Sequence, residues 1–217
     1  MEVERQWRHR RLTPALYDFV VERERIARPA GRLIWGADVG PLFESMAETV
    51  RLPPGSAVLD MPCGGGVAFR GLQPGADLRY VAADLSPVML GRARAQARRR
   101  GLRVAFAEAS VFGLPFGPGV FDLCVTYNGL HCLPDPAAAV AELARVLRPG
   151  GLLRGSTLVT GAGVRQDVLL ALLRATGDFG RPGTEPDLHD WLAAAGLRDV
   201  VVRTSGAFAY FTAVKPD

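Results

Sequence analysis

Lysine is almost absent from this sequence. Lys215 is the only lysine, so arginine supplies nearly all of the 26 basic side chains, and the net charge is +4. Uniform use of arginine beside abundant alanine, glycine and proline indicates the codon bias of a GC-rich genome rather than selection for phosphate binding. The clusters at residues 8–11 and 98–100 are therefore interpreted as solvated surface and not as an RNA-binding patch. We expect no nucleic-acid partner.

Paired cysteines are also lacking. Cys63, Cys124 and Cys132 are odd in number and form no CxxC motif, which excludes a disulfide framework and a zinc site. Cys63 and Cys124 are interpreted as small buried hydrophobic residues. Cys132 follows His131, but no set of partner residues accompanies it as a catalytic thiol would require. We expect no metal.

Long apolar runs and an export signal are missing as well. No window approaches the roughly 18 uninterrupted apolar residues that a membrane helix needs. Residues 1–7 contain acids and a tryptophan where a secretory signal has a basic and then an apolar region. The sequence predicts a cytoplasmic protein with no membrane partner.

What the sequence does contain is a glycine-rich loop after a short apolar run. Residues 57–59 are predicted to form a buried parallel strand, followed by Asp60 and then by Gly64, Gly65 and Gly66. Glycines leave the backbone open to close approach by a ligand. A strand, a glycine loop and then a helix is the arrangement with which doubly wound α/β proteins bind nucleotide-like cofactors.

The rest of the chain alternates between strand and helix patterns. The final two apolar runs are joined by three residues, too few for a crossover helix, so they must pair antiparallel. We predict one α/β domain over residues 1–217, a Rossmann-like doubly wound seven-stranded sheet, mostly parallel with a terminal antiparallel hairpin and helices on both faces. Residues 1–50 are predicted to form a helical cap that is broken at residues 29–31. The predicted strands lie at residues 57–59, 78–83, 104–106, 120–126, from 152, 200–202 and 208–211. The predicted helices that follow the cap begin at Pro87 and Pro136 and span residues 163–175 and 185–195.

The glycine loop does not fit a dinucleotide. The third glycine of the GxGxxG fingerprint is replaced by Phe69. Asp60 would repel a pyrophosphate, whereas it suits a cationic group such as an α-ammonium. These features favour S-adenosylmethionine, which has an amino-acid end, a ribose and an adenine but no phosphate.

Six motifs in series resemble those of the class I S-adenosylmethionine-dependent methyltransferases. The resemblance covers roughly residues 40–214 and is closest to the branch with the ubiquinone and menaquinone C-methyltransferases and many bacterial small-molecule tailoring enzymes. The matching segments are residues 58–66, 84–90, 114–116, 121–123, 129–131 and 147–151.

The resemblance implies a role for each matching residue. Asp60 would hold the ammonium group, Asp84 the ribose hydroxyls, and Leu85 and Met89 would sandwich the adenine, while Asn128 and Gly129 would face the methionine part and the transferred methyl. Asp84 also fits a purely structural reading as a helix cap, and Met89 fits one as a core methionine. The other implied cofactor-binding residues are Met61, Pro62, Cys63, Gly64, Gly66, Ser110, Val111, Tyr17 and Trp35. Two positions depart from the family pattern: Pro62 replaces a glycine and removes a backbone donor, and Ser110 replaces an aspartate with a weaker acceptor.

The reaction implied is in-line transfer of a methyl group to an O, C or N atom of a small-molecule acceptor. His131 is the candidate general base, if the acceptor must lose a proton, but it also fits a structural histidine at a helix start. Residues 127–130 lack the Asn/Asp-Pro-Pro-Tyr motif of enzymes that methylate base amino groups. A non-methylating step such as cyclisation on the same cofactor, and a non-catalytic partner subunit, remain alternatives, and a homodimer remains open.

Overall fold

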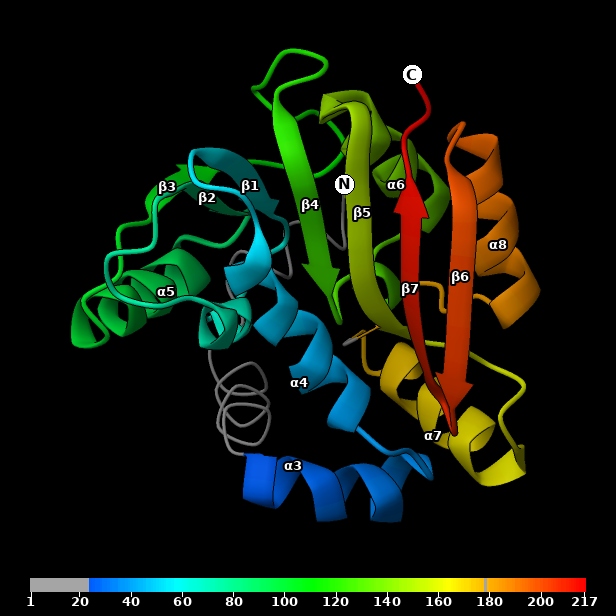
Figure 1. The fold of residues 1–217 in the computed structure, drawn as a ribbon. Coiled ribbons are helices and arrows are strands. Elements are labelled where there is room, and N and C mark those ends of the chain that lie inside the picture. Colours follow the sequence, from blue (N-terminus) through cyan, green and yellow to red (C-terminus); the bar gives the residue numbers. More distant parts are fainter. Residues whose placement is uncertain (1–23, 178) are drawn as a thin grey trace.

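The computed structural model describes residues 24–177 and 179–217, which form one seven-stranded sheet flanked by helices (Figure 1). The strand order is β3-β2-β1-β4-β5-β7-β6, and the first five of these strands are parallel. The predicted fold class is confirmed. The strands are β1 (Ser56–Asp60), β2 (Leu78–Asp84), β3 (Ala105–Glu108), β4 (Phe121–Tyr127), β5 (Leu147–Leu158), β6 (Arg198–Ser205) and β7 (Phe208–Val214).

The central strands are apolar on both faces because helices cover both faces of the sheet. All five residues of β1 are buried, and β4 is buried at every position except the half-buried Asp122. The helices are α3 (Glu24–Ala30), α4 (Gly40–Ala47), α5 (Pro87–Arg99), α6 (Pro136–Val146), α7 (Val164–Ala175) and α8 (Glu185–Ala194).

Two hydrophobic cores lie on opposite faces of the sheet. One contains Met46 of α4 and Leu90 of α5, packed on Val58 and Leu123. The other contains apolar residues of α6 and α8, including Leu143, packed on the opposite face. Figure 1 shows α4 and α5 on one side of the sheet, with α6 and α8 on the other.

Helix starts follow the capping residues of the sequence. The side chain of Ser86 accepts a hydrogen bond from the backbone N–H of Met89 (3.4 Å) at the start of α5. Asp135 caps α6 in the same way through Ala138. Proline at the first helical position of both helices has no N–H to leave unsatisfied. The start predicted at Pro87 is confirmed.

The end of the chain forms the predicted antiparallel hairpin. β6 and β7 pair antiparallel, and β7 pairs antiparallel with β5 from Leu152↔Val214 to Leu158↔Phe208. The turn before Phe208 therefore lies beside the carboxyl end of β5, at the edge where the parallel strands end.

The segment after the glycine loop differs from the expected helix. It is a five-residue 3₁₀ helix, η3 (Val67–Gly71), and no α-helix intervenes before β2. α4 packs closely against it: a Cβ on Gly71 would lie 1.9 Å from the peptide oxygen of Met46. α4, from the N-terminal part of the chain, thus occupies the face of the sheet beside β1.

The predicted break at residues 29–31 is wrong. α3 includes Pro29 and continues directly into a π-helical turn, η1 (Gly31–Trp35). The wider i→i+5 bonds of this turn continue the helix beyond the proline, which lacks an N–H. The chain leaves the helix at Gly36, which has φ +64° and donates its N–H to the peptide oxygen of Gly31.

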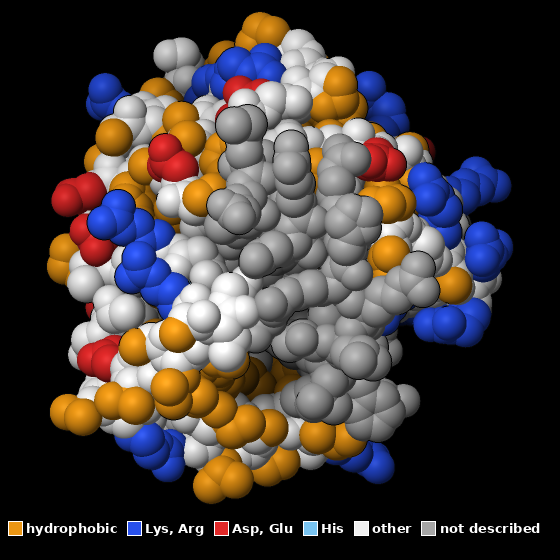
Figure 2. All heavy atoms as spheres, turned by 180° about the vertical axis from the view of Figure 1, so that it is seen from behind, with side chains coloured by type: hydrophobic (Ala, Val, Ile, Leu, Met, Phe, Trp, Pro, Cys, Tyr) orange, Lys and Arg blue, Asp and Glu red, His pale blue; other side chains and the backbone are white. Residues whose placement is uncertain are grey.

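One side of the molecule carries a concentration of arginine. Residues 85–107 contain six arginines and no acidic residue, and Figure 2 shows basic side chains gathered on the side where α5 lies. Arg98 and Arg99 are exposed, as a solvated helix end requires. Among the described residues, no helix combines the length and apolarity needed to span a membrane.

Candidate functional site

The predicted site residues follow the carboxyl ends of neighbouring parallel strands. Asp60 ends β1, Asp84 ends β2, and Asn128 follows β4 directly. β1 lies between β2 and β4, and the sheet order reverses direction between β1 and β4. Ligands of doubly wound folds bind in the crevice outside this switch point. The structure therefore brings these polar residues to one edge of the sheet.

The glycine loop is held by backbone bonds to both neighbouring strands. The N–H of Met61 donates to Val125 of β4 (3.0 Å), and that of Cys63 donates to Ala83 of β2 (2.8 Å). The peptide between Met61 and Pro62 is cis. Pro62 packs against the loop after β4, since a Cβ on Gly129 would lie 2.6 Å from its ring.

Two glycines of the loop occupy backbone conformations that other residues rarely adopt. Gly64 has φ +53° and Gly66 has φ +94°. A Cβ on Gly66 would lie 2.5 Å from the ring of Phe69, which is fully buried and packs edge-on against Tyr80 (centroids 5.8 Å apart). Phe69 stands at the third fingerprint position and fills the space next to the loop. The loop and this aromatic ring therefore fix one another.

Asp60 is a buried acid with one hydrogen-bond donor. It is 1% exposed, and the hydroxyl of Tyr80 donates to its Oδ2 (3.1 Å). Burial raises the pKa of Asp60 to about 8, while the bond from Tyr80 acts in the opposite direction and the nearby charge of Asp84 adds to the rise. The carboxyl group therefore holds a proton at neutral pH unless a cation approaches it.

Asp84 fastens the glycine loop to the end of β2. Its Oδ2 accepts the N–H of Gly64 (2.9 Å) and its Oδ1 accepts that of Ser86 (2.8 Å). Burial raises the pKa of Asp84, and the two backbone bonds oppose that rise. Each carboxylate oxygen can also accept a hydrogen bond from a hydroxyl group.

α5 covers the far side of the loop. The Nε2 of Gln96 donates to the peptide oxygen of Gly66 (3.2 Å). Met89 is buried, and its Cε lies 3.6 Å from the place of a Cβ on Gly64, while Leu85 is half-buried. Ser110 lies beyond the carboxyl end of β3, where its Oγ accepts the N–H of Phe112 (3.3 Å).

Asn128 has a left-handed backbone and an oriented side chain. Its φ is +56°, a conformation for which asparagine is among the favoured residues. Its N–H donates to the peptide oxygen of Ser156 (2.8 Å), and the hydroxyl of Ser156 donates to its Oδ1 (2.8 Å). The Nδ2 is buried and has no hydrogen-bond partner within the described residues.

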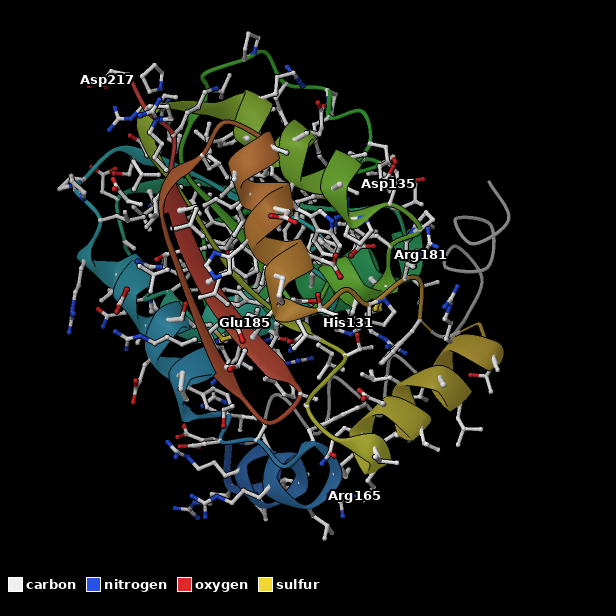
Figure 3. The ribbon with its side chains drawn as sticks, turned by 90° about the vertical axis from the view of Figure 1, so that its right-hand side faces the viewer. His131, Asp135, Arg165, Arg181, Glu185 and Asp217 are labelled. Carbon is white, nitrogen blue, oxygen red and sulfur yellow. The ribbon has the colours of Figure 1, made fainter. Side chains whose placement is uncertain are left out.

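His131 is enclosed rather than open to a ligand. It is 3% exposed, and its ring lies 4.6 Å from that of Phe179 in an edge-on contact. The N–H of Leu158 donates to its Nδ1 (3.2 Å), so the proton of the neutral ring resides on Nε2. Burial lowers the pKa of His131 to about 3. This geometry does not favour the general base expected from the sequence. Figure 3 shows His131 in the interior, whereas Arg165 lies at the outer surface.

Tyr17 and Trp35 were also expected in the site. Tyr17 falls outside the described residues. Trp35 lies at the same edge of the sheet but farther along it, where its peptide oxygen accepts the N–H of Ala207 (3.1 Å) in the turn before β7. No group of three His, Cys, Asp or Glu side chains in residues 24–177 and 179–217 could hold a metal ion.

Three residues of this network were missed from the sequence. Tyr80 points to Asp60 because residues 58 and 80, and 60 and 82, are register partners, so Tyr80 and Asp60 share one face. Aligning Asp60 with Asp84, the acids that end both strands, gives a register two residues off but also places Tyr80 and Asp60 on one face. The roles of Gln96 and Ser156 could not be predicted, because the sequence around a polar residue in a helix or strand does not indicate its hydrogen-bond partner.

A family profile described as "Methyltransferase domain" matches residues 59–154. A ubiquinone biosynthesis O-methyltransferase from Methylococcus capsulatus is 33% identical over 178 residues, which cover 78% of this chain and 74% of that protein. A demethylmenaquinone methyltransferase from Thermus thermophilus is 41% identical over 99 residues, or 44% of each chain. The chain spans about half the length of several other curated relatives that it matches.

The fold also matches solved structures. A phosphoethanolamine N-methyltransferase from Haemonchus contortus, solved with phosphomonomethylethanolamine and S-adenosylhomocysteine, superposes with a TM-score of 0.71 at 16% identity. The match covers 92% of this chain and 59% of the other. At this identity the match shows a shared fold.

Proposed function

The chain belongs to the S-adenosylmethionine-dependent methyltransferases, with S-adenosylmethionine as its cofactor, and on that premise we propose that it transfers a methyl group to an O, C or N atom of a small-molecule acceptor. The observation that carries this proposal is the meeting of buried Asp60, the glycine loop and Asp84 at the carboxyl edge of the sheet. The family implies the reaction class. The geometry offers Asp60 as a partner for the ammonium group and Asp84 as a partner for the ribose.

The charges of the site fit the cofactor. Asp60 is buried beside the loop and would become a carboxylate next to the α-ammonium group, because a cation stabilises its charged form. The oxygens of Asp84 can each accept a ribose hydroxyl while keeping their backbone bonds to Gly64 and Ser86. Gly64 and Gly66 leave main-chain atoms open beside the ligand.

The adenine is assigned to the apolar rim beyond Asp84. Leu85 and Met89 offer side chains on one side, and Val111 is buried close by in the loop after β3. The Ser110 hydroxyl accepts the backbone N–H of Phe112, and we assign the adenine amino group to the same hydroxyl. The methionine end is assigned to Met61, Pro62, Cys63, Asn128 and Gly129.

When bound, the cofactor supplies a methyl group activated by a sulfonium sulfur. The residues at this edge of the sheet would align the acceptor and exclude water, and no oxyanion needs to be stabilised. Asp60 would hold the ammonium group, and Asp84 would hold the ribose hydroxyls. Pro62 packed against Gly129 closes the space between the loops after β1 and β4.

No proton-accepting role is assigned to His131. Its Nδ1 accepts the N–H of Leu158 and its pKa lies near 3, so it stays neutral with Nε2 protonated. Phe179, which is half-buried against the His131 ring, adds an apolar side chain to this region. We therefore assign the chain to an apolar small-molecule acceptor that needs no strong protein base.

The test combines calorimetry with mass spectrometry. Titration with S-adenosylmethionine should give saturable binding, and incubation with a panel of phenols, quinols and amines should add one methyl group and release S-adenosylhomocysteine. Asp135→Asn, which preserves a surface helix cap, serves as the active control, and Asp84→Ala as the impaired variant. Absence of binding at millimolar cofactor would overturn the proposal. A product formed without methyl gain would instead indicate a non-methylating reaction.

A further inference from the structure

The Asn128 side chain carries a hydrogen-bond donor that the described residues do not satisfy. Asn128 is 8% exposed, and its Nδ2 is buried without a partner. A buried N–H group without a hydrogen-bond partner destabilises a fold. Such a group directly after β4, at the carboxyl edge of the sheet, is open to a ligand atom that accepts the bond.

The orientation of this donor is fixed by Ser156 of β5. The Ser156 hydroxyl donates to Oδ1 at 2.8 Å, and the Ser156 peptide oxygen accepts the Asn128 N–H at 2.8 Å. Ser156 is itself fully buried in the centre of the sheet. With Oδ1 occupied, the amide is held with Nδ2 directed away from β5.

Asp60 and Asn128 lie on adjacent strands, since Asp60 is the register partner of Val125 on β4. One offers an acid and the other an unsatisfied donor. An α-amino acid group needs both, because its ammonium seeks an anion and its carboxylate seeks N–H donors.

We propose that Ser156 is a positioning residue that orients the Asn128 amide so that its Nδ2 donates to the carboxylate of the cofactor's amino-acid end. This inference rests on the proposed function and adds a specific determinant to it. Ser156 touches no ligand; it acts through Asn128. Asn128 oriented by Ser156 would therefore favour a ligand that has the carboxylate over the same ligand without it.

Two probes isolate the carboxylate. S-adenosylhomocysteine contains it, and S-adenosyl-3-thiopropylamine keeps the adenosine, the thioether and the ammonium group but lacks it. Calorimetry gives the affinity ratio of the two probes for each variant. Asn128→Asp keeps the shape and the left-handed backbone but replaces the donor with an acceptor. Ser156→Ala removes the orienting hydroxyl and leaves the amide in place.

Asn128→Asp should lower the preference for S-adenosylhomocysteine by about tenfold or more, and Ser156→Ala by about threefold or more. Affinity for the carboxylate-free probe should change little in Ser156→Ala and should not fall in Asn128→Asp, which adds an anion near the ammonium group. Thr126→Val is the matched control, because it removes a buried hydroxyl of β4 for which the described residues offer no partner, and it should leave the ratio unchanged. Thermal unfolding confirms that each variant is folded.

The outcomes separate this inference from the proposed function. If the wild type binds neither probe, the proposed function fails. If the wild type binds both and the ratio is the same in Asn128→Asp, Ser156→Ala and Thr126→Val, the function stands and the positioning role is overturned. Equal loss of affinity for both probes in Ser156→Ala would show a structural role only and would also overturn it.

Discussion

Asp60→Asn should make the protein more stable and a poorer ligand binder. In the folded protein the pKa of Asp60 is raised to about 8, from 3.8, chiefly by burial. Below pH 4 the carboxyl group is protonated in both the folded and unfolded states and makes no difference between them. Between pH 4 and 8 the unfolded chain gives up this proton while the folded chain keeps it.

Stability therefore falls as pH rises through this window, because the folded state binds the extra proton. Each pH unit removes up to about 1.4 kcal/mol from the free energy of unfolding. Asparagine keeps the shape and an oxygen for the Tyr80 hydroxyl but has no proton to lose. We expect the variant to be more stable than the wild type by about 1–2 kcal/mol at pH 5 and by about 4–6 kcal/mol at pH 8.

Urea unfolding at pH 5, 6, 7 and 8 measures this difference directly. Asp84 and the phenol groups of Tyr80 and Tyr127 also lie near Asp60, and they are common to both proteins. Asp135→Asn, at an exposed helix cap, should follow the wild type at every pH. A stability difference between Asp60→Asn and wild type that stays constant from pH 5 to 8 would refute the reasoning.

Three further expectations follow from the same site. Gly66→Ala should destabilise the fold by about 1–3 kcal/mol, because residue 66 has φ +94° and the new Cβ would meet the Phe69 ring. Gly91→Ala in α5 has open space around it and should stabilise the fold slightly. Chemical unfolding compares the two variants. Asp84→Ala should weaken S-adenosylmethionine binding by about 1–3 kcal/mol in calorimetry, and unchanged affinity would contradict the ribose assignment. Binding of S-adenosylmethionine at pH 6–7 should release a proton from Asp60. The release should make the calorimetric heat depend on the buffer, and this dependence should be lost in Asp60→Asn. Buffer-independent heats in the wild type would argue against contact between Asp60 and the ammonium group.

The strands could be predicted because parallel, doubly covered strands have a simple sequence pattern. Residues 120–126 were predicted as a strand and β4 spans Phe121–Tyr127, because a short run that is nearly all apolar is typical of a strand covered on both faces. The final hairpin followed from the short connection between its strands alone. These features depend on local sequence and on connection length.

The errors arose where distant contacts override local signals. Pro29 usually ends a helix, yet here the chain passes into a π-helical turn beside α7 and the β6–β7 turn. The short η3 after the glycine loop depends on α4 filling the space, which no residue near Gly71 reveals. His131 has an ordinary sequence context, and only burial against Phe179 and the bond from Leu158 show its state.

The structure of the chain with S-adenosylhomocysteine tests the central claim most directly. The account predicts the ligand across the carboxyl ends of β1, β2 and β4, with its ribose hydroxyls on Asp84 and its ammonium group beside Asp60. Binding at another edge of the sheet, or with the amino-acid end away from Asp60, would contradict it.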